Sequence, residues 1–371
     1  MNFFFRAAME DKVEEGKVRH ARRAARWART VPVEDAAGMV LAHDITEVRL
    51  DFKGPAFRKG HIVKEEDIEH LRRLGKERLY VLELGPLMMH EDEAANILAE
   101  SLMGPGVRIE GEPREGKINL VAALAGLLKV EETALMRFNM GGEVICSTLH
   151  DNTLVKEGQK VAATRAIPLV VEKKAVQKAA GVARKKGGII RVKPLRRPRA
   201  GIVITGGEVF SGRIKDAFAP VMARKIEAYE GEVTGVAYAP DDENEIESRL
   251  REFIDKGADL LIATGGMSVD PDDVTRFAIR RLGASKLIYG SPVLPGAMLL
   301  VAYLEAGETT IPILGVPTCA MYSKVTALDL VLPRILAGEE IGRTDLARLG
   351  HGGLCLHCPV CTYPNCPFGK C

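Results

Sequence analysis

Residues 259–268 read DLLIATGGMS, and this stretch decides the fold. Its run from Leu260 to Ala263 carries only apolar side chains, which is typical of a parallel-sheet strand covered on both faces. The run ends in a Thr-Gly-Gly turn, and paired glycines let the backbone approach a ligand closely and expose its N–H groups. The stretch therefore predicts a buried strand that ends at a binding loop.

Strands and helices alternate on either side of this stretch. Residues 200–207, AGIVITGG, repeat the pattern of an apolar strand that ends in two glycines. Further strands are expected over 233–238 and 311–314, and helices over 216–229, 243–254, 272–282 and 322–336. Repeated strand–helix–strand units imply an open, mostly parallel sheet. We therefore predict a three-layer α/β/α domain over residues 199–338.

The chain of 371 residues is too long for a single core, so two or three domains are expected. Smaller mixed α+β modules are predicted ahead of the α/β domain, with helices over 93–102 and 120–128. The expected order is a basic helix at 1–30, a small α+β module at 31–85, a mixed or β-rich module at 86–180, a basic linker at 181–198, the α/β domain at 199–338 and a cysteine-rich tail at 350–371.

Charge and hydropathy narrow the classes of partner. The net charge is +2, and no run approaches the roughly 18 apolar residues that a membrane helix needs. The first residues lack the pattern of a secretory signal, so we expect a cytoplasmic protein without a membrane partner. Basic residues gather within 17–29 and 184–199. We interpret both runs as solvated segments, with an anion-binding arm or rim as the alternative, and expect no nucleic-acid partner.

Two Gly-Gly turns follow predicted strands. In open α/β sheets, ligands sit beyond the carboxyl ends of the strands, and a helix N-terminus beyond such a turn favours phosphate. One such turn alone would usually be no more than a tight turn, whereas two in one domain predict an anion-binding rim. The turns are Thr205-Gly206-Gly207-Glu208 and Thr264-Gly265-Gly266-Met267-Ser268.

Acidic residues lie beside both turns. Asp270, Asp272 and Asp273 follow the second turn, and Asp241 and Asp242 follow the strand expected at 233–238. Carboxylates repel a phosphate unless a cation lies between them, and Mg²⁺ is usually held by one or two carboxylates plus substrate phosphates. The pattern predicts a Mg²⁺-bridged phosphate or nucleotide. The alternative for Asp272 and Asp273 is that they cap the helix that follows.

Short motifs surround the two turns, namely TGGMSV at 264–269, DVT at 273–275, TGGE at 205–208, Asp216, PDD at 240–242, Pro295-Gly296 and Gly315-Val316-Pro317. Together they resemble the signature of the molybdopterin-binding domain family, which includes molybdopterin molybdotransferase and molybdopterin adenylyltransferase. Residues 38–45 and 59–81 resemble segments of the molybdotransferase. The resemblance therefore favours an enzyme of that branch.

This resemblance implies a reaction and a site. Adenylylated molybdopterin and molybdate (or tungstate) would give the cofactor and AMP with the help of Mg²⁺. Asp241 and Asp273 would hold the cation or act on the pyrophosphate. A homodimer and a molybdoenzyme apoprotein as a further partner are also implied. The remaining ligand-binding residues would be Thr205, Gly206, Gly207, Glu208, Asp216, Thr264, Gly265, Gly266, Ser268, Asp270, Thr275, Arg276, Pro295 and Gly296.

Two departures from the family pattern favour another class of function. Asp270 stands where the family usually has glycine, and the second proline loop, residues 314–317, lacks the usual polar residue. Both favour a non-catalytic carrier or sensor of the cofactor, whereas the retained Asp241 and Asp273 favour the enzyme. Hydrolysis of a nucleotide pyrophosphate on the same fold is a third alternative, because fold alone does not fix function.

Five of the seven cysteines lie within the last seventeen residues. In a chain without a secretory signal, this clustering indicates metal rather than disulfides. The short spacings suit a thiolate site for Zn²⁺ or an iron–sulfur cluster, and a disordered reduced tail is the alternative. Cys146 and Cys319 are isolated and read as small core residues. The predicted metal ligands are Cys355, Cys358, Cys361, Cys366 and Cys371.

Overall fold

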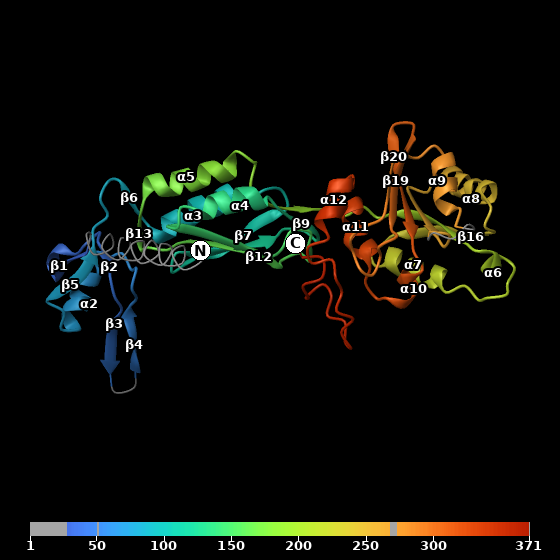
Figure 1. Cartoon of the computed structure of the whole chain (residues 1–371). Helices are drawn as coiled ribbons and strands as arrows, with labels where there is room; N and C mark the ends of the chain where they lie inside the picture. The colour runs from blue at the N-terminus through green and yellow to red at the C-terminus, as the bar shows by residue number, and fades with distance from the viewer. Residues whose placement is uncertain (1–27, 50–51, 268–272, 371) are drawn as a thin grey trace, which may run out of the picture. The chain divides into compact units, whose positions relative to one another are not determined.

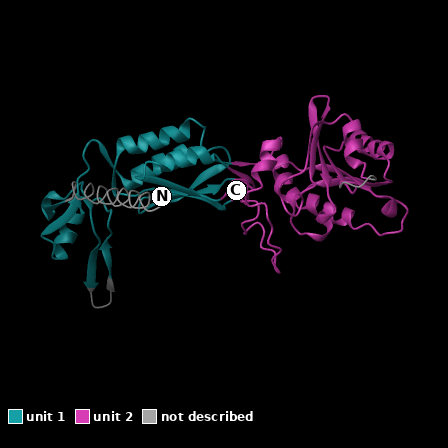
Figure 2. Ribbon diagram, in the orientation of Figure 1, with its two compact units in different colours: residues 1–123, 130–149, 158–191 teal, residues 124–129, 150–157, 192–371 magenta. Residues whose placement is uncertain are grey.

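The computed structural model describes residues 28–49, 52–267 and 273–370 (Figure 1). The basic helix predicted over 1–30 falls outside these residues, except that residues 28–30 begin a strand. The chain divides into two compact units (Figure 2), of which the first holds residues 1–123, 130–149 and 158–191 and the second holds 124–129, 150–157 and 192–371. None of the helices in the described ranges is long and apolar enough to cross a bilayer.

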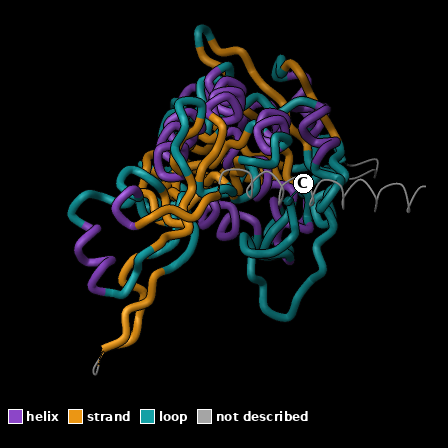
Figure 3. The backbone as a smooth tube through the Cα atoms, turned by 90° about the vertical axis from the view of Figure 1, so that its left-hand side faces the viewer, coloured by secondary structure: helices purple, strands orange, loops and turns teal. Residues whose placement is uncertain are grey.

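The first unit begins with a small α+β module built on a three-stranded antiparallel sheet of order β1-β5-β2. Val31, Leu41, Leu71 and Val81 form its core. Figure 3 shows β3 and β4 side by side as a hairpin. The elements are β1 (Ala28–Pro32), η1 (Val33–Asp35), β2 (Val40–Leu41), β3 (Ile45–Arg49), β4 (Phe52–Phe57), α2 (Asp67–Arg73) and β5 (Arg78–Leu82).

The rest of the first unit is an antiparallel sheet of order β10-β12-β8-β7 with helices packed on it. Helix α3 packs on β8 and β12, and α5 packs on α3 and α4. Acidic residues fill the first turn of α3, where the helix dipole favours them. The elements are β6 (Met88–His90), α3 (Glu91–Leu102), β7 (Val107–Arg114), β8 (Lys117–Ala122), α4 (Glu132–Asn139), β10 (Val144–Thr148), β12 (Lys160–Ala166), β13 (Val170–Glu172) and α5 (Lys173–Arg184).

The helix predicted over 93–102 is confirmed, but the one over 120–128 is wrong. That stretch falls in β8 and in β9 (Gly126–Val130), which lies in a sheet of order β11-β9-β14 with β11 (Leu154–Val155) and β14 (Ile190–Lys193). A Cβ on Gly126 would lie 2.2 Å from the Lys193 carbonyl oxygen, so this close backbone approach fixes the strand. The segment predicted as a basic linker at 181–198 includes the end of α5 and all of β14.

The second unit contains the predicted α/β domain, and its mostly parallel sheet is confirmed. The strand order is β16-β15-β17-β20-β19-β18, in which the first four strands pair in parallel and β19 pairs antiparallel with both β20 and β18. The strands are β15 (Arg199–Thr205), β16 (Glu232–Ala239), β17 (Leu260–Thr264), β18 (Ser285–Tyr289), β19 (Leu300–Ala306) and β20 (Thr309–Val316). The helices are α6 (Gly207–Phe210), α7 (Phe218–Glu227), α8 (Glu243–Asp255), α9 (Thr275–Arg281), α10 (Cys319–Tyr322), α11 (Ala327–Leu336) and α12 (Arg343–Arg348).

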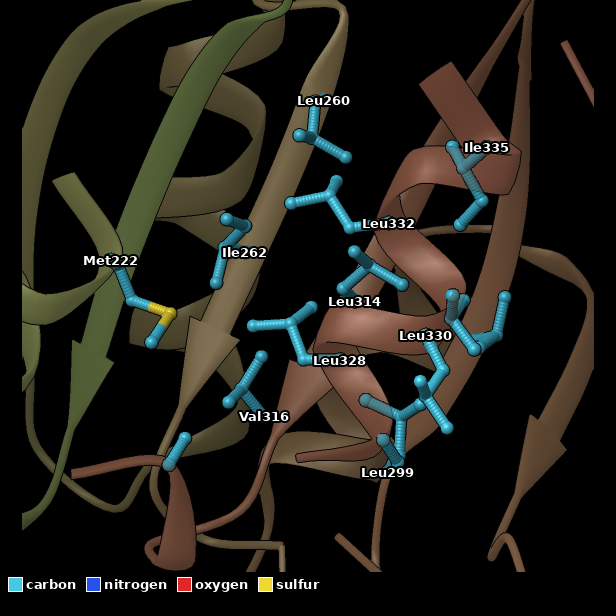
Figure 4. Close-up of a cluster of buried hydrophobic side chains, with 14 of the residues drawn as sticks. Met222, Leu260, Ile262, Leu299, Leu314, Val316, Leu328, Leu330, Leu332 and Ile335 are labelled. Carbon is cyan, nitrogen blue, oxygen red and sulfur yellow. The ribbon is translucent and has the colours of Figure 1, made fainter. Parts of the chain in front are cut away.

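Alternate side chains of the central strands enter two different cores, because successive residues of a strand point to opposite faces. Ile202 of β15 packs in the core shared with α7 and α11, whereas Val203 packs in the core shared with α8 and α9. Figure 4 shows the first core, where Leu328 of α11 lies near Leu314 and Val316 of β20. Helices on both faces complete the three predicted layers, and burying each such side chain contributes roughly 1.5–3 kcal/mol.

A network of ion pairs joins Arg334 of α11 to Glu339 and Lys129. Arg334 Nε donates to Glu339 Oε2 at 2.9 Å, and Lys129 Nζ lies 2.9 Å from Glu339 Oε1. Burial alone would raise the pKa of Glu339, but the hydrogen bonds from Lys129 and Arg334 outweigh burial and lower it below 4.5. The stabilisation is therefore complete above the unfolded pKa and is lost as the pH falls through the lower folded pKa.

We expect Glu339→Gln to destabilise α11 by about 2 kcal/mol at pH 7, because it removes the carboxylate that Lys129 and Arg334 share and leaves each with only its second partner, Asp151 and Asp345. The difference from the wild type should shrink as the pH falls from 4.5 through the lower folded pKa, where the wild-type carboxylate becomes protonated. Hydrogen exchange of the α11 amides measures this change. Glu340→Gln is the matched control, since Glu340 pairs with Lys286 on an exposed surface. Equal effects of the two variants would contradict the prediction.

Candidate functional site

The site lies where the strand order of the six-stranded sheet reverses. From β15 the chain crosses to β16 on one side and then to β17 on the other. Ligands of open α/β sheets bind beyond the carboxyl ends of the strands at such a switch point. Strand β15 ends at Thr205 and β17 ends at Thr264, and Ile204 pairs with Thr264 in the parallel ladder. The two predicted Gly-Gly turns therefore lie next to each other.

The second turn needs both of its glycines. Gly265 has φ +87° and Gly266 has φ +54°, in the left-handed region that favours glycine. A Cβ on Gly265 would lie 2.4 Å from the Thr205 carbonyl oxygen, and one on Gly266 would lie 2.5 Å from Thr275 Oγ1. The turn is thus pressed against the end of β15 and the start of α9. Among the residues that the structure describes, neither glycine amide has a hydrogen-bond acceptor.

Three buried threonine hydroxyls lie beneath this turn. Thr205 Oγ1 donates to the Thr264 carbonyl at 3.0 Å, so the 3.0 Å contact between Thr205 Oγ1 and Thr275 Oγ1 has Thr275 as its donor. Thr264 Oγ1 is buried and has no partner among the described residues. A buried hydroxyl without a hydrogen bond costs free energy, so this group indicates that a ligand or a water completes the site.

Asp241 accepts a hydrogen bond from the first Gly-Gly turn. Gly207 N donates to Asp241 Oδ2 at 2.8 Å, and Gly206 N donates to the Ala239 carbonyl at 3.3 Å. Asp241 itself is exposed. Its neighbour Asp242 instead caps α8, because its side chain accepts from Asn244 N at 2.9 Å. Of the two adjacent carboxylates, only Asp241 contacts the Gly-Gly turn.

Two other predicted ligand residues lie near the first turn. Asp216 caps α7, since Oδ1 accepts from Phe218 N at 2.7 Å, and Oδ2 accepts from the Tyr238 hydroxyl at 3.1 Å. Burial and the Asp216 carboxylate raise the pKa of Tyr238. Glu208, in the short helix α6, is exposed. The structure therefore gives Asp216 a capping role beside the site.

Arg276 supplies positive charge near the second turn. Its guanidinium carbon lies 4.8 Å from the centroid of the Phe277 ring and 5.6 Å from that of Tyr289. Its Nε is buried without a partner among the described residues. The Tyr289 hydroxyl donates to the Met267 carbonyl at 2.5 Å and so ties the turn to β18. Tyr289 and Met267 were not predicted as site residues, because strand β18 was not predicted.

The loop of Pro295 and Gly296 lies at the same sheet edge. It precedes Leu300, which pairs with Gly315 near the carboxyl end of β20. Gly296 has φ +120°, and a Cβ there would lie 2.6 Å from Ala327 N. The loop is therefore pressed against the first residue of α11, and the Pro295 carbonyl accepts from Ala327 N at 3.1 Å.

The acidic residues after the second turn are only partly described. Ser268 and Asp270 lie outside the described residues, and Asp273 comes just before α9. Val274, the N-cap residue of α9, makes no side-chain cap hydrogen bond. Within residues 28–49, 52–267 and 273–370, no three His, Cys, Asp or Glu side chains gather closely enough to hold a metal ion. Mg²⁺ at this edge stays a prediction, for which Asp241, with one oxygen on the Gly207 amide, offers a carboxylate.

Comparisons with known proteins bear on this domain. A family model described as "Probable molybdopterin binding domain" matches residues 201–337. This domain belongs to the molybdopterin-binding family. The molybdopterin-binding domain is of the kind found in molybdenum-cofactor biosynthesis. A second model, a domain of unknown function (DUF8806), matches residues 30–83.

Relatives and solved structures resemble parts of the chain. A CinA-like protein of Mycobacterium avium is 35% identical over 95 residues, which are 26% of this chain and 22% of that protein. The chain thus spans about a fifth of that relative's length. The tungsten cofactor synthesizing protein MoaB of Pyrococcus furiosus shares 18% identity over 38% of this chain and 92% of its own, with a TM-score of 0.32. The molybdopterin biosynthesis enzyme MoaB of a Thermus species shares 23% identity over 38% of this chain and 98% of its own, with a TM-score of 0.32.

Proposed function

We propose that the molybdopterin-binding domain holds the phosphate of a molybdopterin on its two Gly-Gly turns and that the chain catalyses the molybdotransferase reaction. In that reaction, adenylylated molybdopterin and molybdate, or tungstate, give the molybdenum or tungsten cofactor and AMP. Water attacks the AMP phosphorus as the phosphoanhydride bond breaks, which releases AMP and leaves the pterin phosphate. The two dithiolene thiols bind the metal and displace one oxide of molybdate, which leaves as water with the two thiol protons. A cytoplasmic homodimer that passes the cofactor to a molybdoenzyme apoprotein is part of this proposal.

The proposal is carried by the unsatisfied polar groups at the end of β17. The Gly265 and Gly266 amides and the Thr264 hydroxyl have no partner among the described residues. Successive amides in a left-handed turn form a concavity that binds anions, and a phosphate supplies the acceptors that these groups need. Arg276, whose Nε is also unpartnered within the described part of the chain, adds a cation. Together these groups favour a phosphate-bearing ligand over an apolar one.

Asp241 would hold Mg²⁺ together with the ligand phosphates, with Asp273 as the second carboxylate. When bound, the cation would neutralise charge that develops on the pyrophosphate. Asp241 also fixes the first turn through Gly207 N, so it positions the phosphate-binding backbone as well. Thr205 and Thr275 keep the second turn against the end of β15. The protein's part in the reaction is therefore to orient the pyrophosphate and to balance its charge.

A non-catalytic carrier or sensor of molybdopterin is the second candidate function. It is favoured because no cluster of three potential metal ligands forms among the described residues. A site with one well-positioned carboxylate can bind a pterin phosphate without cleaving a phosphoanhydride. The backbone groups that bind phosphate are the same in both cases, so the two candidates differ in turnover and not in binding.

Release of AMP distinguishes these candidates. Purified full chain is incubated with adenylylated molybdopterin, Mg²⁺ and molybdate, and AMP is quantified over time. We expect AMP release that requires both molybdate and Mg²⁺. In the proposed reaction Mg²⁺ neutralises charge on the pyrophosphate, and cleavage of the pyrophosphate accompanies insertion of molybdenum. Stoichiometric binding of the pterin without AMP release would exclude the transferase and establish the carrier. AMP release without molybdate would instead indicate a pyrophosphate hydrolase.

A further inference from the structure

Four cysteine side chains of the C-terminal tail line one pocket of about 220 Å³. All four are free thiols. Cys355 and Cys366 are half-buried and pack against the core of the second unit, whereas Cys358 and Cys361 are exposed. Cys371 lies outside the described residues and is not part of this set.

The tail is fastened to the second unit on both sides of these cysteines. Before them, Cys355 N donates to the Leu294 carbonyl at 2.8 Å, and Leu354 forms a parallel bridge with Leu294. After them, the Phe368 ring is only 4% exposed, and its edge contacts Tyr363, which lies between Cys361 and Cys366. A Cβ on Gly369 would lie 2.4 Å from a Leu330 methyl carbon, so the chain presses on α11 there. These anchors fix both ends of the thiol-bearing loop.

Apolar packing does not account for residues 356–362, which lie between Cys355 and Tyr363. Residues 355–370 contain no helix or strand, and Leu356 and Val360 are 72% and 74% exposed. Short irregular segments with so little buried apolar surface generally need a disulfide or a metal to hold their shape. No disulfide joins the cysteines of the described residues. The four thiols around one pocket are therefore the groups that remain to organise the loop.

We propose that Cys355, Cys358, Cys361 and Cys366 ligate a [4Fe–4S] cluster in this pocket. Cys355, Cys358 and Cys361 have the x2 and x2 spacing of the three cysteines that share one cluster in the bacterial C-x2-C-x2-C-x3-C-P run, whose fourth cysteine ligates a second cluster. Here Cys366 lines the same pocket as the other three and would supply the fourth thiolate. Four thiolates are the usual ligand number for such a cluster. This site is separate from the Gly-Gly turns and does not depend on the function proposed for them.

The room in the pocket favours a cluster over a single ion. A Zn²⁺ ion with Zn–S bonds of about 2.3 Å draws its four sulfurs to roughly 3.8 Å from one another and leaves no space between them. The thiolates of a cubane cluster stand farther apart, and the pocket of about 220 Å³ leaves room for the inorganic core between them.

The test measures iron, acid-labile sulfide and zinc in the full chain purified without oxygen. The variants are Cys358→Ser and Cys358→Ser/Cys361→Ser, because both side chains are exposed and their replacement leaves the core unchanged. Cys319→Ser is the matched control, since Cys319 is a half-buried cysteine of the same unit that does not line the pocket. Circular dichroism establishes that each variant is folded.

We expect about four iron and four sulfide per wild-type chain, with broad visible absorption. The double variant should lose most of both while keeping its circular dichroism, and Cys319→Ser should keep both. Stoichiometric zinc in place of iron, lost in the same variants, would overturn the cluster in favour of a zinc site. Absence of any metal after reconstitution with Fe²⁺ and sulfide, or iron that survives in the double variant, would overturn the proposal entirely.

Discussion

Replacing Gly265 with alanine is expected to weaken molybdopterin binding about a hundredfold and to destabilise the second unit by about 3 kcal/mol. The new Cβ would lie 2.4 Å from the Thr205 carbonyl oxygen, in a backbone with φ +87°. The left-handed conformation alone costs an alanine roughly 1–2 kcal/mol, and overpacking adds a similar amount. The turn must therefore move, and it takes the Gly265 and Gly266 amides away from the phosphate.

Gly307→Ala is the matched control for this variant. Gly307 has φ +65°, but a Cβ there meets nothing within 4 Å. It should cost about 1 kcal/mol through the backbone alone and leave pterin affinity unchanged. Affinity is measured by equilibrium titration with molybdopterin, and stability by thermal unfolding. Gly265→Ala with wild-type affinity would show that the second turn does not contact the ligand.

Asp241→Asn is expected to lower the rate of AMP release about a hundredfold, because the charge balance that a bound cation provides is worth several kcal/mol. The amide oxygen of asparagine still accepts a hydrogen bond from Gly207 N, so the first turn keeps its conformation. Pterin affinity should therefore fall less than turnover does. The measurement is kcat and KM for AMP release at saturating Mg²⁺.

Asp242→Asn controls for the loss of one negative charge at the same edge. Asparagine is as good an N-cap as aspartate, so α8 keeps its cap on Asn244 N. We expect turnover within twofold of the wild type, since Asp242 does not contact either Gly-Gly turn among its described hydrogen bonds. If both variants lose turnover equally, the effect comes from the total negative charge at this edge of the sheet, and Asp241 has no specific role.

The sequence was most informative where a strand is covered on both faces. A strand covered on both faces has apolar side chains throughout, as residues 260–263 do. This run and its repeat at 200–207 predicted β17, β15 and the layered domain. The ends of these strands also predicted that the two Gly-Gly turns share one edge. That inference needs only parallel strands, whose carboxyl ends point the same way.

Other features depend on contacts that a local pattern does not contain. The composition of residues 120–128 favours a helix, but Gly126 lies against the Lys193 backbone and begins strand β9. The β18–β19 pair was missed, and with it Tyr289, whose hydroxyl holds the Met267 carbonyl. Long-range contacts decide both of these cases. Asp216, which the family resemblance implies as a ligand residue, makes a local contact with Phe218 N at the start of α7, and its role toward a ligand stays a prediction.

Hydrogen–deuterium exchange of the full chain with and without molybdopterin tests the central claim most directly, because it reports on the amides that should bind the phosphate. Peptides that cover 203–210 and 262–267 are predicted to exchange more slowly when the pterin is present. Peptides that cover β7 and β8 of the first unit should not change. Protection confined to the first unit or to the cysteine tail, with unchanged exchange at the two Gly-Gly turns, would contradict the account.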